Sequence, residues 1–218
     1  MLESSLNTTQ LIPLSGVIET ELGDAVREPV AQLTVFRRSL PRELICWLEA
    51  LPVKRLPSLR ILTRAANLPH VLTDADLLGA IEDCPARAML IADIAAQAAL
   101  FAGAAKSEWV DVRLEAIHNN ACWKFHRDFV SLRLLTTYRG PGTEWVLPSH
   151  REAALEQQRK YKGSLEKAPA GAVLLFRNDL DEGEGIVHRS PPVARSKQSR
   201  LLLCLSPRGP WSPDPWQR

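Results

Sequence analysis

The sequence lacks the features that mark several common protein classes. It has four cysteines in 218 residues and no CxxC pair, which argues against a disulfide scaffold and against a zinc ribbon. Its longest apolar stretch, residues 89–105, is interrupted by Asp93 and Gln97 and is shorter than the ~20 apolar residues of a bilayer helix, so no membrane span is expected. No glycine-rich phosphate loop follows any predicted strand, which argues against a dinucleotide-binding fold.

The chain also lacks an excess of charge of either sign. Its 27 Lys+Arg balance 25 Asp+Glu, and 45% hydrophobic with 24% charged residues is an ordinary globular composition. The basic residues between positions 37 and 64 match no recognisable nucleic-acid-binding motif, so nucleic acid is not an expected partner. No Lys or Arg precedes Arg27, so the sequence predicts neither a secretory nor a mitochondrial leader, and a cytoplasmic location is expected. The widely spaced cysteines are expected to be reduced thiols.

Length and composition predict one domain with short extensions, since a domain has about 100–200 residues. Residues 1–25 are expected to form a flexible leader, and residues 26–207 the single domain. Within the domain, a helical platform over 26–107 precedes a β core over 108–207. Residues 208–218, rich in proline and tryptophan, can form neither a helix nor a central strand and are expected to drape over the domain.

The first half of the domain is predicted to be mainly helical. Apolar residues recur at helical spacing after Pro41, which suits a first-turn position. Thr73 with Asp76 is typical of a capping box that opens a short helix. Pro85 precedes a longer helix over 86–105 with one apolar face.

The second half changes to a period of two, which is typical of half-buried strands. A helix over 150–161 is expected to begin after Ser149. The fold class is therefore α+β, with a sandwich or barrel favoured over a parallel sheet. The strands are predicted at 109–117, 131–138, 144–147, 172–176, 186–190 and 200–205.

Two histidines and one aspartate form the first candidate site. His126 and Asp128 are two residues apart, so on a strand both side chains point to one face and can bind one metal ion. His188 lies in a later predicted strand, which a jelly roll could bring back to this pair. Together they make the two-histidine, one-carboxylate triad of non-haem iron, with positions left open.

Arg200 and Tyr138 are candidates for binding a carboxylate beside the metal. Arg200 begins a predicted buried strand, and its planar guanidinium can hold a carboxylate through two hydrogen bonds. Tyr138 could donate another hydrogen bond to the same group. The alternatives are a strand-end position in solvent for Arg200 and core packing for Tyr138. The pocket is expected to be positively charged, because residues 189–200 include four basic residues and no acidic one: Arg189, Arg195, Lys197 and Arg200.

These residues carry two resemblances. His126-x-Asp128, then His188, then Arg200 resembles the signature of the 2-oxoglutarate and iron(II)-dependent dioxygenases. A wider pattern, over residues 26–207, is similar to an uncharacterised bacterial family of unknown function that itself resembles those enzymes. The segments that carry it are CWKFHRD (122–128), RLLTTYRGPGTEW (133–145), HRSPP (188–192) and RLLL (200–203).

The dioxygenase resemblance implies a double-stranded β-helix, a jelly-roll or cupin-like core in the C-terminal half with N-terminal supporting helices. It implies Fe(II) held by His126, Asp128 and His188, and the cosubstrate 2-oxoglutarate held by Arg200. The reaction would be the hydroxylation or demethylation of a substrate that the sequence does not identify. This chain departs from the family pattern, because Arg-x-Ser is replaced by Arg200-Leu-Leu and that hydroxyl is missing.

Two alternatives involve zinc. His118, Cys122 and His126 are four residues apart and would line one face of a helix as zinc ligands, but the turn-like Asn119–Asn120 favours a strand and makes Cys122 a small buried residue. The second alternative is a non-oxidative jelly-roll protein that binds zinc at the triad or serves as an interaction module.

Overall fold

The computed structural model describes residues 17–19, 31–74, 78, 81–178, 185–194, 196 and 198–217. Most of the predicted leader lies outside this part of the chain, and so does Asp76 of the predicted capping box.

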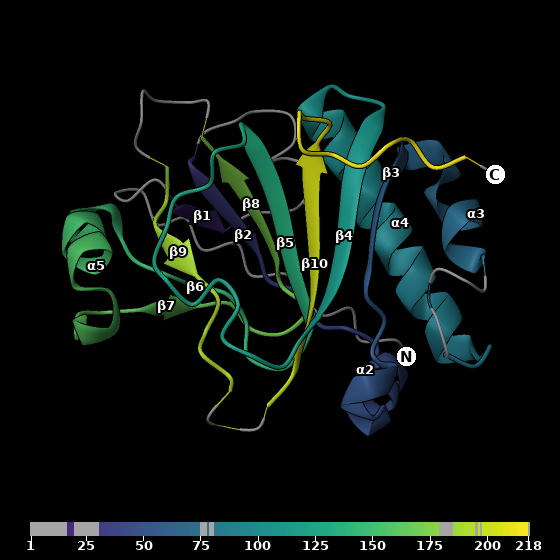
Figure 1. The fold of residues 1–218 in the computed structure, drawn as a ribbon, viewed down its shortest axis with the longest axis horizontal. Helices are drawn as coiled ribbons and strands as arrows, with labels where there is room; N and C mark the ends of the chain where they lie inside the picture. The colour runs from purple at the N-terminus through teal and green to yellow at the C-terminus, as the bar shows by residue number, and fades with distance from the viewer. Residues whose placement is uncertain are drawn as a thin grey trace, which may run out of the picture.

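The described chain combines helices with two sheets, as the α+β prediction expected. The major sheet has the strand order β1-β2-β8-β5-β10-β4-β3, and the minor sheet has the order β7-β6-β9 (Figure 1). All neighbouring strands are antiparallel except β1 and β2. The major strands are β1 (Val17–Glu19), β2 (Leu33–Phe36), β3 (Leu59–Arg64), β4 (Trp109–Ile117), β5 (Leu132–Arg139), β8 (Val173–Arg177) and β10 (Arg200–Pro207). The minor strands are β6 (Glu144–Trp145), β7 (Glu166–Lys167) and β9 (His188–Arg189).

Helices α2 (Arg42–Ala50) and α4 (Pro85–Ala105) pack against one face of the major sheet, and α3 (Leu68–Thr73) packs against α4 (Figure 1). In α4, Leu90, Ile94 and Phe101 are buried in a core cluster with apolar residues of β4, β5 and β10. By length and composition α4 is long and apolar enough to cross a membrane, but its buried residues belong to this core. The predicted helix over 86–105 is confirmed.

The other face of the major sheet packs against the minor sheet. Trp145 of β6, with Phe176 of β8 and Leu202 of β10, belongs to a second core cluster between the sheets. Helix α5 (Arg151–Gln157) lies beyond the minor sheet (Figure 1). Short 3-10 turns complete the described elements: η1 (Val53–Arg55), η2 (Ala65–Asn67), η3 (Pro148–His150) and η4 (Gln158–Lys160).

From β4 onward the chain passes repeatedly between the two sheets. Strands β4, β5, β8 and β10 belong to the major sheet, and β6, β7 and β9 to the minor one. The segment between β4 and β5 joins the minor sheet through one antiparallel bridge, between His126 and His188. Four segments in each sheet thus come from residues 109–207.

Side chains alternate along each major strand between the face that packs against the helices and the face that packs against the minor sheet. In β4, Val110 and Val112 lie in the helix-side core. Successive side chains of a strand point to opposite faces, so Asp111 and Arg113 point the other way. In β4 the helix-facing side chains are therefore apolar, and the charged side chains Asp111 and Arg113 lie on the face turned away from the helices.

The mainly helical platform also contains two strands, because β2 and β3 join the major sheet. Thr73 is the last residue of α3, and its hydroxyl donates a hydrogen bond to the His70 carbonyl, whereas Asp76 of the predicted capping box lies outside the described residues. Ser149 does not cap the surface helix; it lies in η3, and α5 begins at Arg151 without a side-chain cap.

The C-terminal tail drapes over the domain, as predicted. Pro215 forms a β-bridge with Leu62 of β3, and the Trp216 amide donates to the Leu62 carbonyl at 2.8 Å. The Trp211 carbonyl accepts a hydrogen bond from Arg60. The tail therefore covers the β3 edge of the major sheet.

Candidate metal and cosubstrate site

Two backbone hydrogen bonds place the two candidate histidines side by side. The His126 amide donates to the His188 carbonyl and the His188 amide to the His126 carbonyl, both at 3.0 Å. This exchange makes them a hydrogen-bonded antiparallel pair, whose side chains lie on one face. Their ring centroids are 4.5 Å apart.

Asp128 joins this pair from two residues along the chain. Potential ligand atoms of His126, Asp128 and His188 all lie within 4.8 Å of one another. The Nε2 of His188 is 3.6 Å from an oxygen of Asp128. Asn178 holds the segment after the ligands by donating to the carbonyls of Asp128 and Val130, at 3.2 and 2.8 Å. The predicted triad residues therefore meet in space.

Backbone carbonyls determine which histidine nitrogen is free. The Nδ1 of His126 lies 2.8 Å from the Lys124 carbonyl, and the Nδ1 of His188 lies 3.1 Å from the Ile186 carbonyl. A carbonyl only accepts, so each Nδ1 carries the proton and donates. Each Nε2 then presents a lone pair, as a metal-binding histidine requires.

The two oxygens of the Asp128 carboxylate have different surroundings. Arg133 contacts Oδ1 at 2.8 Å. Oδ2 is buried and has no hydrogen-bond partner among the described residues. A buried carboxylate oxygen without a partner is costly unless a cation binds it. Two free imidazole nitrogens around this oxygen form a donor set that fits a divalent metal ion.

Burial keeps His188 in the neutral form that binds metal. Its residue is 3% exposed, and its ring lies against Phe176 with centroids 4.4 Å apart. Burial lowers the pKa of His188 to about 4, against the opposing pull of the Asp128 charge. The imidazole is therefore unprotonated at neutral pH, so a metal ion has no proton to displace.

Arg200 is fully buried and bound by three hydroxyl groups. Its guanidinium donates to Ser190 Oγ at 2.6 Å, Thr137 Oγ1 at 3.2 Å and Thr143 Oγ1 at 3.4 Å. These partners are neutral, and Nε has no partner among the described residues. Burial lowers the pKa of Arg200 to about 10, which still leaves it charged at neutral pH. A buried cation held only by hydroxyls can bind an anion strongly, because one carboxylate would neutralise it.

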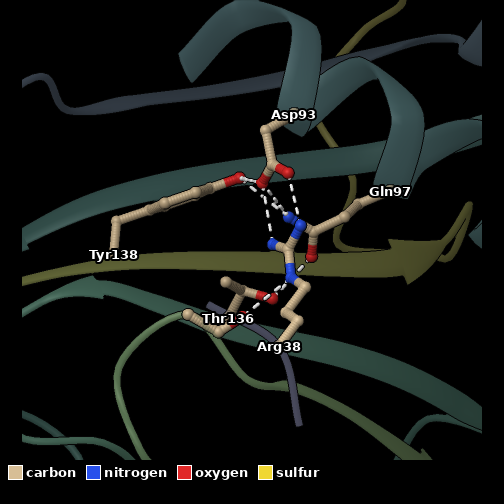
Figure 2. A network of polar contacts seen from close by, with 6 residues as sticks. Arg38, Asp93, Gln97, Thr136 and Tyr138 are labelled. Atoms are coloured by element: carbon tan, nitrogen blue, oxygen red, sulfur yellow. Dashed lines mark hydrogen bonds and ion pairs between the residues drawn. The ribbon is translucent and has the colours of Figure 1, made fainter. Parts of the chain in front are cut away.

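The structure does not bring Tyr138 together with Arg200. Figure 2 shows Tyr138 in a polar network with Asp93 and Gln97 of α4. Its hydroxyl donates to Asp93 Oδ2 at 2.6 Å and accepts from Gln97 Nε2 at 2.8 Å. Thr137, the preceding residue of β5, faces Arg200 instead. Tyr138 therefore points to the helix side of the sheet, the core position that was its alternative interpretation.

The hydroxyls around Arg200 were missed in the sequence. The absent serine of the Arg-x-Ser pattern is replaced by Ser190, Thr137 and Thr143, from three other segments. Ser190 could have been found, because it lies two residues beyond His188 and so shares its face. Arg133 was also missed, although it lies on the same face of β5 as Thr137.

The helical zinc alternative does not fit the structure. His118 and Cys122 are exposed, and no helix spans them. The metal-ligand cluster found in the described chain is the one formed by His126, Asp128 and His188. Cys122 is exposed at a turn, with φ of 51°, so the prediction of a buried thiol is wrong.

The predicted basic wall is only partly within the described chain, since Arg195 and Lys197 lie outside it. Arg189 is committed to other contacts: its Nε donates to Glu144 at 2.8 Å, and its guanidinium lies 4.2 Å from the centroid of the Phe125 ring. Among these residues, Arg200 is the buried guanidinium that has only neutral partners.

Comparisons with known proteins place the chain in a family. Residues 21–206 match the family described as "Protein of unknown function (DUF1826)", and the chain belongs to it. The predicted membership of an uncharacterised family is thus confirmed. A search of curated protein sequences finds no match.

Solved structures of oxygenases resemble the chain at low identity. A prolyl-4-hydroxylase of Pseudomonas putida is 14% identical, with a TM-score of 0.45, covering 88% of this chain and 97% of its own. The dioxygenase for auxin oxidation 1 of Arabidopsis thaliana, in complex with 2-oxoglutarate, is 14% identical, with a TM-score of 0.49 and coverages of 91% and 95%. A Kdo hydroxylase, described as a non-heme Fe(II) alphaketoglutarate dependent dioxygenase, is 12% identical in its apo form, with a TM-score of 0.46 and coverages of 88% and 89%. These scores are too low to carry an argument about function, which rests on the side chains of the site.

Proposed function

We propose that this protein is an oxygenase of the Fe(II)/2-oxoglutarate type that hydroxylates or demethylates a substrate. One observation carries the proposal: the two-histidine, one-carboxylate cluster includes His188 of β9, and Ser190, two residues further on, binds the buried Arg200. The cluster has a carboxylate oxygen without a hydrogen-bond partner among the described residues, and the hydrogen-bond partners of Arg200 are neutral hydroxyls. A metal cation would pair with the carboxylate oxygen, and a carboxylate ligand would pair with the Arg200 guanidinium.

The metal would be held by His126, Asp128 and His188. Three protein ligands on one side leave coordination positions for a cosubstrate and oxygen, the arrangement of non-haem Fe(II) oxygenases. Bound iron with 2-oxoglutarate and O2 supplies the oxidation, with release of succinate and CO2. The chain fixes the tautomer of both histidines through Lys124 and Ile186.

Arg200 would bind the distal carboxylate of 2-oxoglutarate. Its hydroxyl partners hold the guanidinium in one orientation before any ligand arrives, which lowers the entropy cost of binding. Burial also removes competing water and strengthens the charge interaction. Ser190 connects this clamp to the metal, because it lies two residues beyond His188.

A double-stranded β-helix is the fold that we propose for residues 109–207. The repeated passage of the chain between two sheets, with four segments in each, supports a jelly roll. In such a fold the metal ligands would lie between the sheets. The buried positions of His188 and Arg200 agree with that placement.

Turnover with defined metals tests the proposal. Protein loaded anaerobically with Fe(II) should convert 2-oxoglutarate to succinate when O2 is admitted, and Zn(II)-loaded protein should not. Tight stoichiometric zinc without any turnover would contradict the proposal and favour the non-oxidative metal-binding protein.

Variants test the ligands directly. Asp128→Ala should lose tight metal binding, because the carboxylate is the charged ligand. His118→Ala is the matched control for the histidines, since His118 is exposed and lies outside the cluster, and it should bind metal like the parent. Full retention of metal by Asp128→Ala would rule out this site.

A further inference from the structure

A small cavity lies beside the arginine that holds Asp128. Its volume is about 110 Å³, and strands β3, β4, β5 and β10 contribute its lining. The lining residues are Arg60, Asp111, Arg113, Arg133, Cys204 and Ser206. Neither the proposed metal site nor the Arg200 clamp uses this cavity, although Arg133 contacts both the cavity and Asp128.

Three guanidinium groups surround this cavity, each from a different strand. Arg60 and Arg113 are directly opposite in the β3–β4 register, and Arg113 is opposite Cys204 of β10. Like charges directly opposite in a sheet are destabilising. A bound anion would offset the repulsion, and this makes the cluster a candidate binding site.

Burial increases along this row toward the metal site. The side chains of Arg60, Arg113 and Arg133 are 45%, 34% and 21% exposed, and that of Asp128 is 4% exposed. The three guanidinium groups therefore form a row that runs from the partly exposed Arg60 to the buried candidate metal ligand Asp128. A molecule with an anionic group in the cavity would lie beside the proposed metal.

Each of the three arginines contacts a carboxylate, and one of these carboxylates, Asp128, is also a proposed metal ligand. Asp111 accepts two hydrogen bonds from Arg60, and Glu115 lies 3.4 Å from Arg113. Arg133 contacts Asp128, which is also a proposed metal ligand. Metal binding would draw charge from Asp128 and leave Arg133 less compensated. Moreover, the Nε of Arg133 is buried without a partner among the described residues.

We propose that this cavity binds a phosphate or sulfate group of the substrate. The naming of the substrate class rests on the proposed oxygenase function, whereas anion binding itself does not. The volume suits one tetrahedral oxyanion. The oxygens of a tetrahedral oxyanion can accept hydrogen bonds from several directions, and the guanidinium groups approach the cavity from three strands. A carboxylate has only two oxygens, which lie in one plane, and matches this arrangement less well.

Calorimetric titration of the metal-free full chain with inorganic phosphate tests this site. The parent should bind phosphate more tightly than acetate, and Arg113→Gln should weaken phosphate binding at least tenfold. Arg42→Gln, an exposed arginine of α2, is the matched control and should bind phosphate like the parent. Arg60→Gln, at the exposed end of the row, provides a second variant if Arg113→Gln does not fold.

Three results would overturn the site: no phosphate binding by the parent, an equal affinity for acetate, or an affinity unchanged in the folded arginine variants. The same protein titrated with Fe(II) and 2-oxoglutarate separates this inference from the proposed function. Phosphate binding that depends on Arg113 without metal or cosubstrate binding would leave the anion site standing and remove the oxygenase proposal.

Discussion

The guanidinium of Arg200 donates to the hydroxyl of Ser190 at 2.6 Å, and Ser190 lies two residues beyond His188. One short segment therefore supplies both a candidate metal ligand and a partner of the candidate carboxylate clamp. This relationship fixes how the clamp and the metal site are placed relative to each other. The Ser190 hydroxyl, from a separate segment of the chain, also takes the place of the missing hydroxyl of the Arg-x-Ser pattern.

Arg200→Lys should weaken 2-oxoglutarate binding by about tenfold to a hundredfold, because a lysine keeps the charge but loses the two-pronged hydrogen bonding, and a charged hydrogen bond contributes about 1.5–3 kcal/mol. Isothermal titration of the metal-loaded protein measures the change. Metal affinity should stay at the parent value, and Arg42→Lys serves as the exposed control. An unchanged dissociation constant for 2-oxoglutarate would remove the cosubstrate assignment.

Tyr138→Phe should reduce the free energy of unfolding by about 1–3 kcal/mol, because Asp93 and Gln97 lose a buried hydrogen-bond partner. The affinity for 2-oxoglutarate should not change, since Tyr138 faces the helices. Denaturant unfolding and cosubstrate titration of the same variant provide both values. Weaker cosubstrate binding with unchanged stability would restore the role that the sequence predicted for Tyr138.

The ion pair between Arg38 and Asp93 should make part of the stability depend on pH (Figure 2). Burial would raise the pKa of Asp93, but the hydrogen bonds and charge of Arg38, with hydrogen bonds from Tyr138 and Gln97, outweigh it and lower the pKa. A lowered carboxyl pKa gives stability that is present above the unfolded pKa of about 3.9 and is lost as pH falls through the folded value.

The variant Asp93→Asn isolates this contribution. Its free energy of unfolding should be about 1–3 kcal/mol lower than that of the parent between pH 5 and 8. This difference should become smaller below about pH 4. Urea unfolding at several pH values measures it, with the exposed Asp214→Asn as control. A difference that stays constant down to pH 2–3 would contradict the lowered pKa.

The clustering of the three candidate ligands could be predicted from the sequence, because His126 and Asp128 share a face at a spacing of two. His188 lies far along the chain, and its place in a later predicted strand and in the dioxygenase-like signature pointed to it. The predicted role of Tyr138 is wrong because its side chain lies on the face of β5 opposite to Arg200. Thr136 bonds to Gln97 on the helix side while Thr137 bonds to Arg200, so Tyr138 must follow Thr136.

The parts of the fold that were missed depend on partners far apart in the chain. Strand β2 has four residues and pairs with β8, and β3 pairs with β4. Short apolar runs of this kind do not distinguish a strand from a helix, so pairing in the folded chain decides between them. The clamp hydroxyls Thr137, Thr143 and Ser190 likewise come from separate segments that only the fold brings together.

The central claim is that one site binds a divalent metal and 2-oxoglutarate. A crystal soaked anaerobically with Fe(II) and 2-oxoglutarate tests it most directly. The account predicts one metal ion bound by His126, Asp128 and His188 at about 2.0–2.2 Å, with the distal carboxylate of 2-oxoglutarate on Arg200. Metal bound elsewhere, or 2-oxoglutarate bound away from Arg200, would contradict it.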